Sequence, residues 1–296
     1  MQTPTIPHGG FLAFQGADPD DLNSRLAADE RAASVVYADQ GLVLAAWSQF
    51  PGQGLWQGQG GAVAYDLDLT NQQALCNLVD LPVTTDPGAL LFTLYRTFGQ
   101  AFLDRLRGAF AFALWDAAAA DLLVVSDGYG IRPVVHTNSD TGFAAASRLR
   151  QLELAGFERR INPEAIYHYL FFQAICSPIS IYRDVYKLEP GALLLSSDGR
   201  VEQQQWYDLR YQPIAGRSEE DWCRDIQQQL KAAVGRFVPA ADGPATGCFL
   251  SGGTDSSSIV GSYAEHSSQP VETFSIGFAD PRFNELDFAR LAVERF

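Results

Sequence analysis

Short apolar runs separated by Gly, Asp and Pro dominate the N-terminal part of the chain. Such runs predict β-strands. We expect a strand in GGFLAFQG (9–16), a hairpin around the Asp39-Gln40-Gly41 turn, and a strand in AVAYDLDL (62–69) whose alternating end indicates half-burial. The segment 106–136 predicts two strands around an Ala-rich turn and a third strand after DGYG. A layered, β-rich domain with packing helices accounts for these patterns.

Helical spacing of apolar positions interrupts this strand pattern twice. DPGALLFTLYRTFG (86–99) predicts a helix with Asp86 as N-cap and Gly99 as C-cap. INPEAIYHYLFF (161–172) predicts a helix that begins at Asn162 and Pro163. The segment 186–209 then predicts another hairpin, with Asp198 and Gly199 in its turn.

The pattern changes after RYQPIAGR (210–217), which is the best candidate for a linker. Ser218 and Asp221 resemble a capping box at the start of a helix. Apolar residues follow at helical spacing, so we expect this helix to pack one face on a core. These residues are Trp222, Ile226, Leu230, Val234 and Phe237.

The last part of the chain alternates strands and helices. ATGCFL (245–250) and VETFSIGF (271–278) have the pattern of short strands, the first of them buried. SSSIVGSYAEH (256–266) and FNELDFARLAVERF (283–296) have the pattern of helices. This order is typical of a doubly wound parallel sheet, which binds ligands where its strands end and its helices begin.

Composition narrows the class of protein. The 296 residues suit about two domains, and the net charge of −14 argues against nucleic-acid or anionic-membrane partners, which need a basic face. The four cysteines lack CxxC spacing, so neither a zinc site nor a disulfide framework is predicted. With no signal-peptide pattern and no long apolar span, we expect a cytoplasmic protein with free thiols.

The loop LSGGTDSS (250–257) carries the candidate chemistry. Gly252 and Gly253 allow a sharp turn that presents backbone N–H groups to an anion, and the following helix points its positive end to the same place. The Ser and Thr hydroxyls add donors, while Asp255 suits Mg²⁺ between phosphates. The pattern favours a pyrophosphate site with its magnesium over the alternative, a helix cap with a polar turn.

Two other glycine-rich segments do not fit a phosphate site. GQGLWQGQGG (52–61) has Gln57, and GYGIRP (128–133) has Pro133, where a dinucleotide fingerprint needs its third glycine. We therefore interpret these two segments as turns. The loop at 250–257 itself lacks the Walker lysine, so it is not a phosphate loop of the GTPase type.

Landmarks along the chain resemble those of the asparagine synthetase family, in the same order. They are LDRLRGAFAFALWD, DGYGIRPVV, VYKLEPGALLL, WYDL, LSGGTDSS, TFSIGF and FNELDFARLAVERF. The resemblance implies an α+β Ntn-hydrolase-like glutaminase sandwich over 1–210, followed by the start of an α/β doubly wound domain of the adenine nucleotide alpha hydrolase type over 217–296.

The resemblance also implies an activity. Synthetase domains of this family use ATP to adenylate a carboxylate, release pyrophosphate, and pass the acyl group to an amine or ammonia. Asp255 would ligate Mg²⁺. The residues implied in binding ATP are Leu250, Ser251, Gly252, Gly253, Thr254, Asp255, Ser256 and Ser257, with Ser275, Ile276 and Gly277 at the adenosine.

The chain departs from the family at the glutaminase site. Active glutaminases carry a nucleophilic cysteine directly after the initiator methionine, whereas this chain has Gln2, and Gly9 aligns with the cysteine. Asp86 aligns with the aspartate that grips the glutamine amine, although helix capping explains Asp86 equally well. We expect an inactive, degenerate glutaminase.

Two branches without that cysteine are the β-lactam synthetases and the lasso-peptide cyclases, which use an amine within the substrate. The sequence therefore leaves several functions open: an asparagine synthetase, a cyclase or β-lactam synthetase, and a non-catalytic nucleotide-binding remnant. A small-molecule or peptide carboxylate is the expected substrate, and a homodimer is left open. The segment after Ser251 is short for a doubly wound domain, so we expect a truncated synthetase domain.

Overall fold

A computed structural model of the chain describes residues 9–16, 19–28, 35–140, 142–239 and 246–296. The chain forms two compact units, Met1–Arg210 and Tyr211–Phe296, which we call the N-terminal unit and the C-terminal unit. Each unit has its own hydrophobic core within these described ranges.

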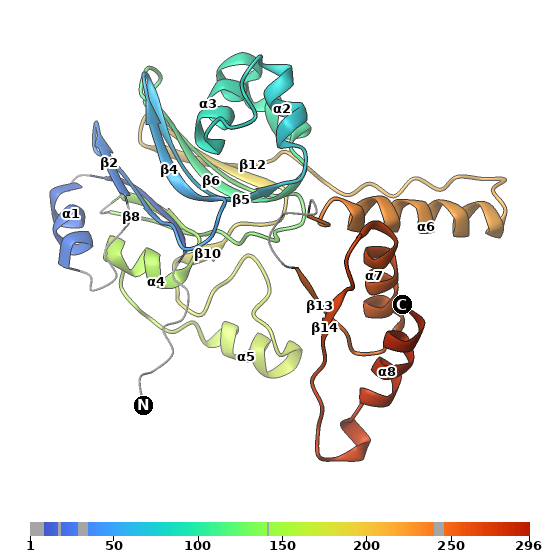
Figure 1. Ribbon diagram of the computed structural model, residues 1–296. Helices are drawn as coiled ribbons and strands as arrows, with labels where there is room; N and C mark the ends of the chain where they lie inside the picture. Colours follow the sequence, from blue (N-terminus) through green and yellow to red (C-terminus); the bar gives the residue numbers. More distant parts are fainter. Residues whose placement is uncertain (1–8, 17–18, 29–34, 141, 240–245) are drawn as a thin grey trace. The chain divides into compact units, whose positions relative to one another are not determined.

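Two six-stranded antiparallel sheets form the N-terminal unit (Figure 1). The first sheet has the order β10-β8-β9-β1-β3-β2 and the second β12-β11-β7-β6-β5-β4. The strands of the first sheet are β1 (Gly10–Gly16), β2 (Val35–Asp39), β3 (Leu42–Trp47), β8 (Val135–Ser139), β9 (Gly142–Ala146) and β10 (Val185–Lys187). Those of the second are β4 (Gln53–Gly58), β5 (Gly61–Leu69), β6 (Gly108–Asp116), β7 (Asp121–Ser126), β11 (Ala192–Ser197) and β12 (Arg200–Gln205).

The predicted hairpins are confirmed. Strands β2 and β3 pair from Asp39↔Leu42 onward, and β11 and β12 pair from Ser197↔Arg200 onward. The turns between them place Gln40 and Asp198 at positive φ, followed by Gly41 and Gly199. Paired left-handed residues of this kind match the twist of a two-residue hairpin.

Helices cover the outer faces of both sheets, so the unit has four layers (Figure 1). The helices α2 (Gln72–Leu78), α3 (Pro87–Phe98) and the 3₁₀ helix η1 (Gly99–Arg105) pack on the second sheet. On the first sheet lie α1 (Pro19–Ala28), α4 (Leu149–Leu152) and η2 (Glu153–Ala155). Small side chains such as Ala62, Ala64 and Ala113 fill the layer between the sheets, which lets the sheets approach closely.

Two expectations about the second sheet were wrong. Strand β5 is buried from Gly61 to Leu67, not half-buried, because its alternate residues face the other sheet and helix α3. Much of the glycine-rich segment 52–61 is strand β4, not a turn. The cross-strand partner β5 supplies a ladder that overrides the poor strand propensity of glycine and glutamine.

Side-chain caps begin three of the helices as predicted. Asp86 accepts a hydrogen bond from the N–H of Gly88 (2.8 Å) at the start of α3, and Gly99 is the C-cap of that helix. Asn162 caps α5 (Pro163–Phe172), and Ser218 caps α6 (Glu219–Gly235) by accepting from Asp221 N–H. Local capping chemistry was sufficient to locate these starts.

The C-terminal unit contains a two-stranded parallel sheet of β13 (Gly247–Phe249) and β14 (Glu272–Phe274). Its helices are α6, α7 (Thr254–His266), the 3₁₀ helix η3 (Pro281–Phe283) and α8 (Leu286–Arg295). The predicted strand–helix alternation and the parallel pairing are confirmed. However, β13 is not a buried strand, since Phe249 is 84% exposed.

Helix α6 corrects another expectation. Of the five apolar positions expected to face a core, Trp222, Ile226 and Phe237 are exposed. Val234 alone of the five packs beside the small core of the C-terminal unit, in the part of the chain that the structure describes. The periodicity correctly predicted the helix, but a two-stranded sheet offers little surface for its apolar face.

Candidate functional site

The candidate site lies where the parallel strands β13 and β14 end. Phe249 pairs with Phe274 at the end of the ladder, and Leu250 N–H donates to Phe274 O (2.9 Å) just beyond it. Ser275 then donates its hydroxyl to Leu250 O (2.6 Å). These bonds bring the two segments after the strands, 250–257 and 275–277, to one edge of the sheet.

The turn between β13 and α7 depends on Gly252. Its φ is +87°, and an added Cβ would lie 2.5 Å from Phe288 C and Ala289 N on helix α8. A side chain at this position would therefore be strained and would collide with backbone. Gly253 is different, because its φ of −70° is ordinary and the nearest atom to an added Cβ is Ser251 Oγ at 3.4 Å.

Hydroxyl groups hold the turn in shape. The backbone N–H of Ser251 donates to Ser256 Oγ (3.2 Å), and the two hydroxyls of Ser251 and Ser256 lie 3.1 Å apart. Gly253 N–H donates to Ser251 Oγ (3.3 Å). The loop is thus braced from its own side chains, with the two serine hydroxyls at its centre.

Helix α7 begins without a side-chain cap. Gly253 is its N-cap, and the first backbone bond of the helix runs from Ser257 N–H to Gly253 O (3.1 Å). The N–H groups of Thr254, Asp255 and Ser256 precede that bond and have no partner inside the helix. They form the positive end of the helix dipole, a ready place for an anion.

A pocket of about 430 Å³ adjoins the loop. Ser251 and Ser256 line the end of the pocket at the loop, and most of the remaining lining is apolar. The full lining is Phe249, Leu250, Ser251, Ser256, Phe274, Ser275, Ile276, Phe278, Phe283, Glu285, Leu286 and Ala289. A flat apolar group carrying phosphates matches this division of polar and apolar surface.

The pocket includes some of the predicted site residues and not others. Leu250, Ser251, Ser256, Ser275 and Ile276 line it. Thr254 and Asp255 are exposed on the first turn of α7, and Ser257 is half-buried there. Gly277 packs against Leu286, which would lie 2.5 Å from an added Cβ.

The aromatic lining was missed in the sequence. Phe249, Phe274, Phe278 and Phe283 contribute it, and all four are exposed by more than half. Apolar residues in strands and helices predict burial, so their pattern gives no sign of a ligand pocket. The exposure of four phenylalanines around one hollow is visible only in the fold.

The metal site remains a prediction. Asp255 is the one carboxylate in the loop 250–257. Among the described residues there is no cluster of three or more His, Cys, Asp or Glu side chains arranged to hold a metal. A divalent ion at Asp255 would therefore draw its other ligands from phosphate and water, as Mg²⁺ commonly does.

Asp86 lies in the N-terminal unit and has a structural role there. Besides capping α3, its carboxylate accepts a hydrogen bond from the Tyr65 hydroxyl (3.1 Å). Burial, and next the charge of Asp86, raise the pKa of Tyr65 above its ordinary value. Both oxygens of Asp86 are thus used within the fold, and its predicted contact with glutamine stays a prediction.

Comparison with known proteins covers both units. A glutamine amidotransferase domain model matches residues 80–207, and an asparagine synthase model matches residues 225–296. A putative glutamine-hydrolyzing asparagine synthetase of Mycobacterium tuberculosis is 32% identical over 222 residues. The chain belongs to the asparagine synthetase family.

This chain is also 31% identical over 203 residues to the glutamine-hydrolyzing asparagine synthetase 1 of Bacillus subtilis. The alignments cover 71% and 68% of this chain but 33% and 31% of the two relatives, so the chain spans about a third of their length. A solved glutamine phosphoribosylpyrophosphate amidotransferase of B. subtilis covers 90% of this chain and 65% of its own, at 14% identity and a TM-score of 0.48.

The family assignment agrees with the folds of both units. The four-layered sandwich is the Ntn-hydrolase-like glutamine amidotransferase fold, and the parallel strands with their helices are the start of the synthetase domain. Among the described residues, no helix is both long and apolar enough to cross a membrane.

Proposed function

We propose that this chain is the nucleotide-binding part of an ATP-dependent ligase that forms amide bonds. The observation that carries the proposal is the uncapped start of α7, directly after the Gly252 turn and beside an apolar pocket. Three features meet there: free N–H donors, serine hydroxyls and a hollow for a flat apolar group.

The loop residues suit the phosphates of ATP. The N–H groups of Thr254, Asp255 and Ser256 would receive the pyrophosphate portion, with the hydroxyls of Ser251 and Ser256 beside them. Gly252 brings the backbone close because no side chain intervenes. Mg²⁺ held by Asp255 would neutralise charge between the phosphates.

The adenosine portion would lie in the pocket, against Ser275, Ile276 and the aromatic lining. Backbone groups of 275–277 are well placed for it because they follow β14 at the same edge. ATP bound in this way supplies the adenylyl group that activates a carboxylate as an acyl-adenylate. The loop then retains the pyrophosphate leaving group through the N–H groups of α7.

The nitrogen donor would not come from glutamine hydrolysis in this chain. Gln2 and Gly9 stand where family glutaminases offer a cysteine, so the resemblance to cysteine-less cyclases and β-lactam synthetases extends to the donor: an amine within the substrate, or free ammonia. The carboxylate would belong to a small molecule or a peptide.

The proposed location is the cytoplasm. The four free cysteines, two of them exposed, suit its reducing conditions.

ATP–pyrophosphate exchange by the protein tests the proposal. Exchange is expected with a carboxylate substrate present, and Asp255→Ala should abolish it. Stimulation by aspartate with ammonia would favour asparagine formation, whereas stimulation by a precursor peptide alone would favour the cyclase. A protein that binds ATP but never exchanges pyrophosphate would be a non-catalytic remnant.

A further inference from the structure

Gly9, at the entrance to strand β1, is buried and faces an amide side chain from another strand. An ideal Cβ added to Gly9 would lie 2.0 Å from Gln53 Oε1 and 2.6 Å from both Gln53 Cδ and Nε2. These distances are far below van der Waals contact. The carboxamide of Gln53 therefore fills the space that any side chain of residue 9 would enter.

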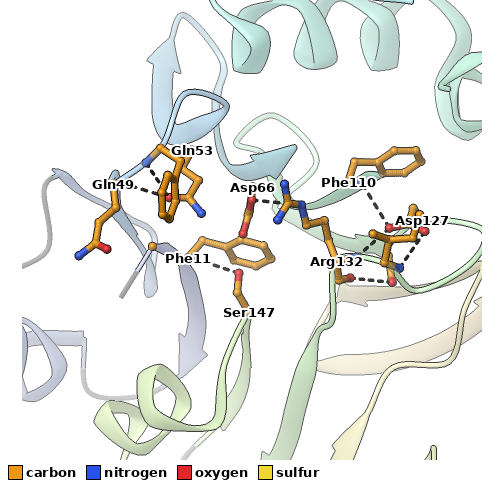
Figure 2. Close-up of polar contacts among 12 residues, drawn as sticks. Phe11, Gln49, Gln53, Asp66, Phe110, Asp127, Arg132 and Ser147 are labelled. Atoms are coloured by element: carbon orange, nitrogen blue, oxygen red, sulfur yellow. Dashed lines mark hydrogen bonds and ion pairs between the residues drawn. The ribbon is translucent and has the colours of Figure 1, made fainter. Parts of the chain in front are cut away.

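The Gln53 carboxamide is held in that place. Its Oε1 accepts hydrogen bonds from the backbone N–H groups of Gln49 and Phe50, both at 3.2 Å (Figure 2). The preceding Gly52 has a φ of +87°, and an added Cβ there would lie 2.0 Å from Leu67 O. The loop before β4 is thus fixed by backbone contacts, and moving the carboxamide would break two hydrogen bonds.

Residue 9 is held as well. Arg148 Nε donates to Gly9 O (3.2 Å), and two residues later Phe11 N–H donates to Ser147 Oγ (3.1 Å; Figure 2). Gly10 has a φ of +133°, and an added Cβ there would lie 2.7 Å from Ser147 Cβ. The start of β1 therefore cannot shift away from Gln53 without breaking contacts with the segment after β9.

We propose that the Gln53 side chain occupies the space beside position 9 and thereby prevents glutamine from binding at this end of the N-terminal unit. The family resemblance aligns Gly9 with the glutaminase nucleophile. The group that fills the space beside Gly9 is the primary carboxamide of Gln53, the same functional group that a free glutamine substrate carries. At position 9 the unit thus has neither a nucleophilic side chain nor the space for one. This inference goes beyond the proposed function and does not depend on ATP.

Substituted proteins test the occupancy. Gly9→Ala should lower the melting temperature of the wild-type chain and lower it much less in the Gln53→Ala background, because removing the carboxamide makes room for the added methyl group. Gln57→Ala is the matched control, since Gln57 is an exposed glutamine on the same strand. In that background Gly9→Ala should keep its full effect. An equal loss in all three backgrounds would overturn the proposal.

Amide hydrogen exchange provides a second readout, which reports on the two Gln53 hydrogen bonds residue by residue. Gln49 and Phe50 are exposed, so water can replace the lost acceptor and Gln53→Ala should fold. Their amides should exchange faster in both Gln53→Ala and Gly9→Ala, but not in Gln57→Ala. Free L-glutamine should leave the wild-type melting temperature unchanged; a rise on its addition, or slow exchange at both amides in Gly9→Ala, would contradict the closure.

Discussion

At the scale of single residues, two neighbouring glycines in the loop have different physical roles. Gly252 is required by its left-handed backbone and by the backbone of helix α8, which lies where a side chain would be, whereas Gly253 has an ordinary conformation and room for a methyl group. The sequence pattern marks both as turn residues and gives no reason to rank them. The structure ranks them because it shows which one faces backbone.

We therefore expect Gly252→Ala to lower the free energy of unfolding of the C-terminal unit by about 2 kcal/mol, from left-handed strain and the clash at 2.5 Å. MgATP affinity should fall with it, since the loop must move. Gly253→Ala is the control and should fold normally. Urea unfolding and calorimetric titration measure both effects, and equal behaviour of the two variants would refute this account of the turn.

Asp127 shows how one buried carboxylate organises a loop. Its Oδ2 accepts from the N–H groups of Phe110 (3.2 Å) and Arg132 (2.9 Å), and its Oδ1 from those of Tyr129 (3.0 Å) and Ile131 (3.1 Å; Figure 2). Side-chain bonding of this kind replaces a backbone ladder in the turn DGYGIRP.

Asp127→Asn keeps the shape but turns one acceptor atom into a donor that faces N–H groups. We expect it to lower the free energy of unfolding of the N-terminal unit by about 3 kcal/mol. Asp198→Asn is a matched control, because Asp198 is exposed in a hairpin turn where asparagine is equally suitable. Similar chemical denaturation midpoints for the two variants would contradict the role of Asp127.

At the scale of elements, local signals located most strands and helices. Caps at Asp86, Asn162 and Ser218 and the turns at Gly41 and Gly199 depend on neighbours in the chain, so they could be predicted from the sequence. The burial of β5 and the exposure of α6 could not, since each depends on which layer covers the element. The candidate loop was predictable in position, but its aromatic pocket was not.

Strand β8 carries a titratable group that the proposed chemistry does not use. Burial lowers the pKa of His136 from 6.5 to about 4, and its ring packs near Tyr186. The unfolded chain takes up a proton near pH 6.5, while the folded chain resists protonation until about pH 4. The folded N-terminal unit therefore has its full stability with respect to His136 above pH 6.5, and it loses stability through this group as the pH falls toward 4.

We expect the free energy of unfolding of the N-terminal unit to decrease by up to about 3 kcal/mol between pH 6.5 and 4 through this group. His136→Gln should remove that part of the pH dependence, and His266→Gln, in the C-terminal unit, should leave it unchanged. Urea titrations at several pH values measure the slope. An unaltered slope in His136→Gln would assign the acid sensitivity elsewhere.

At the scale of the whole molecule, the two units divide the expected functions between them. The N-terminal unit keeps the four layers of a glutamine amidotransferase, and the C-terminal unit carries the loop and pocket. The net charge of −14 does not prevent phosphate binding, because the proposed ligands are backbone amides and hydroxyls at one helix start. An anion at the start of α7 would therefore interact mainly with these nearby donors, whatever the sign of the net charge of the chain.

The most direct test of the nucleotide site is amide hydrogen exchange of the chain with and without MgATP. Binding is expected to slow exchange in 251–257 and 275–277 and to leave the strands of the N-terminal unit unchanged. Asp255→Ala should lose this protection, while Asp287→Ala, which alters an acidic residue in the first turn of α8, should keep it. Unchanged exchange at the loop, or protection that persists in Asp255→Ala, would contradict the account.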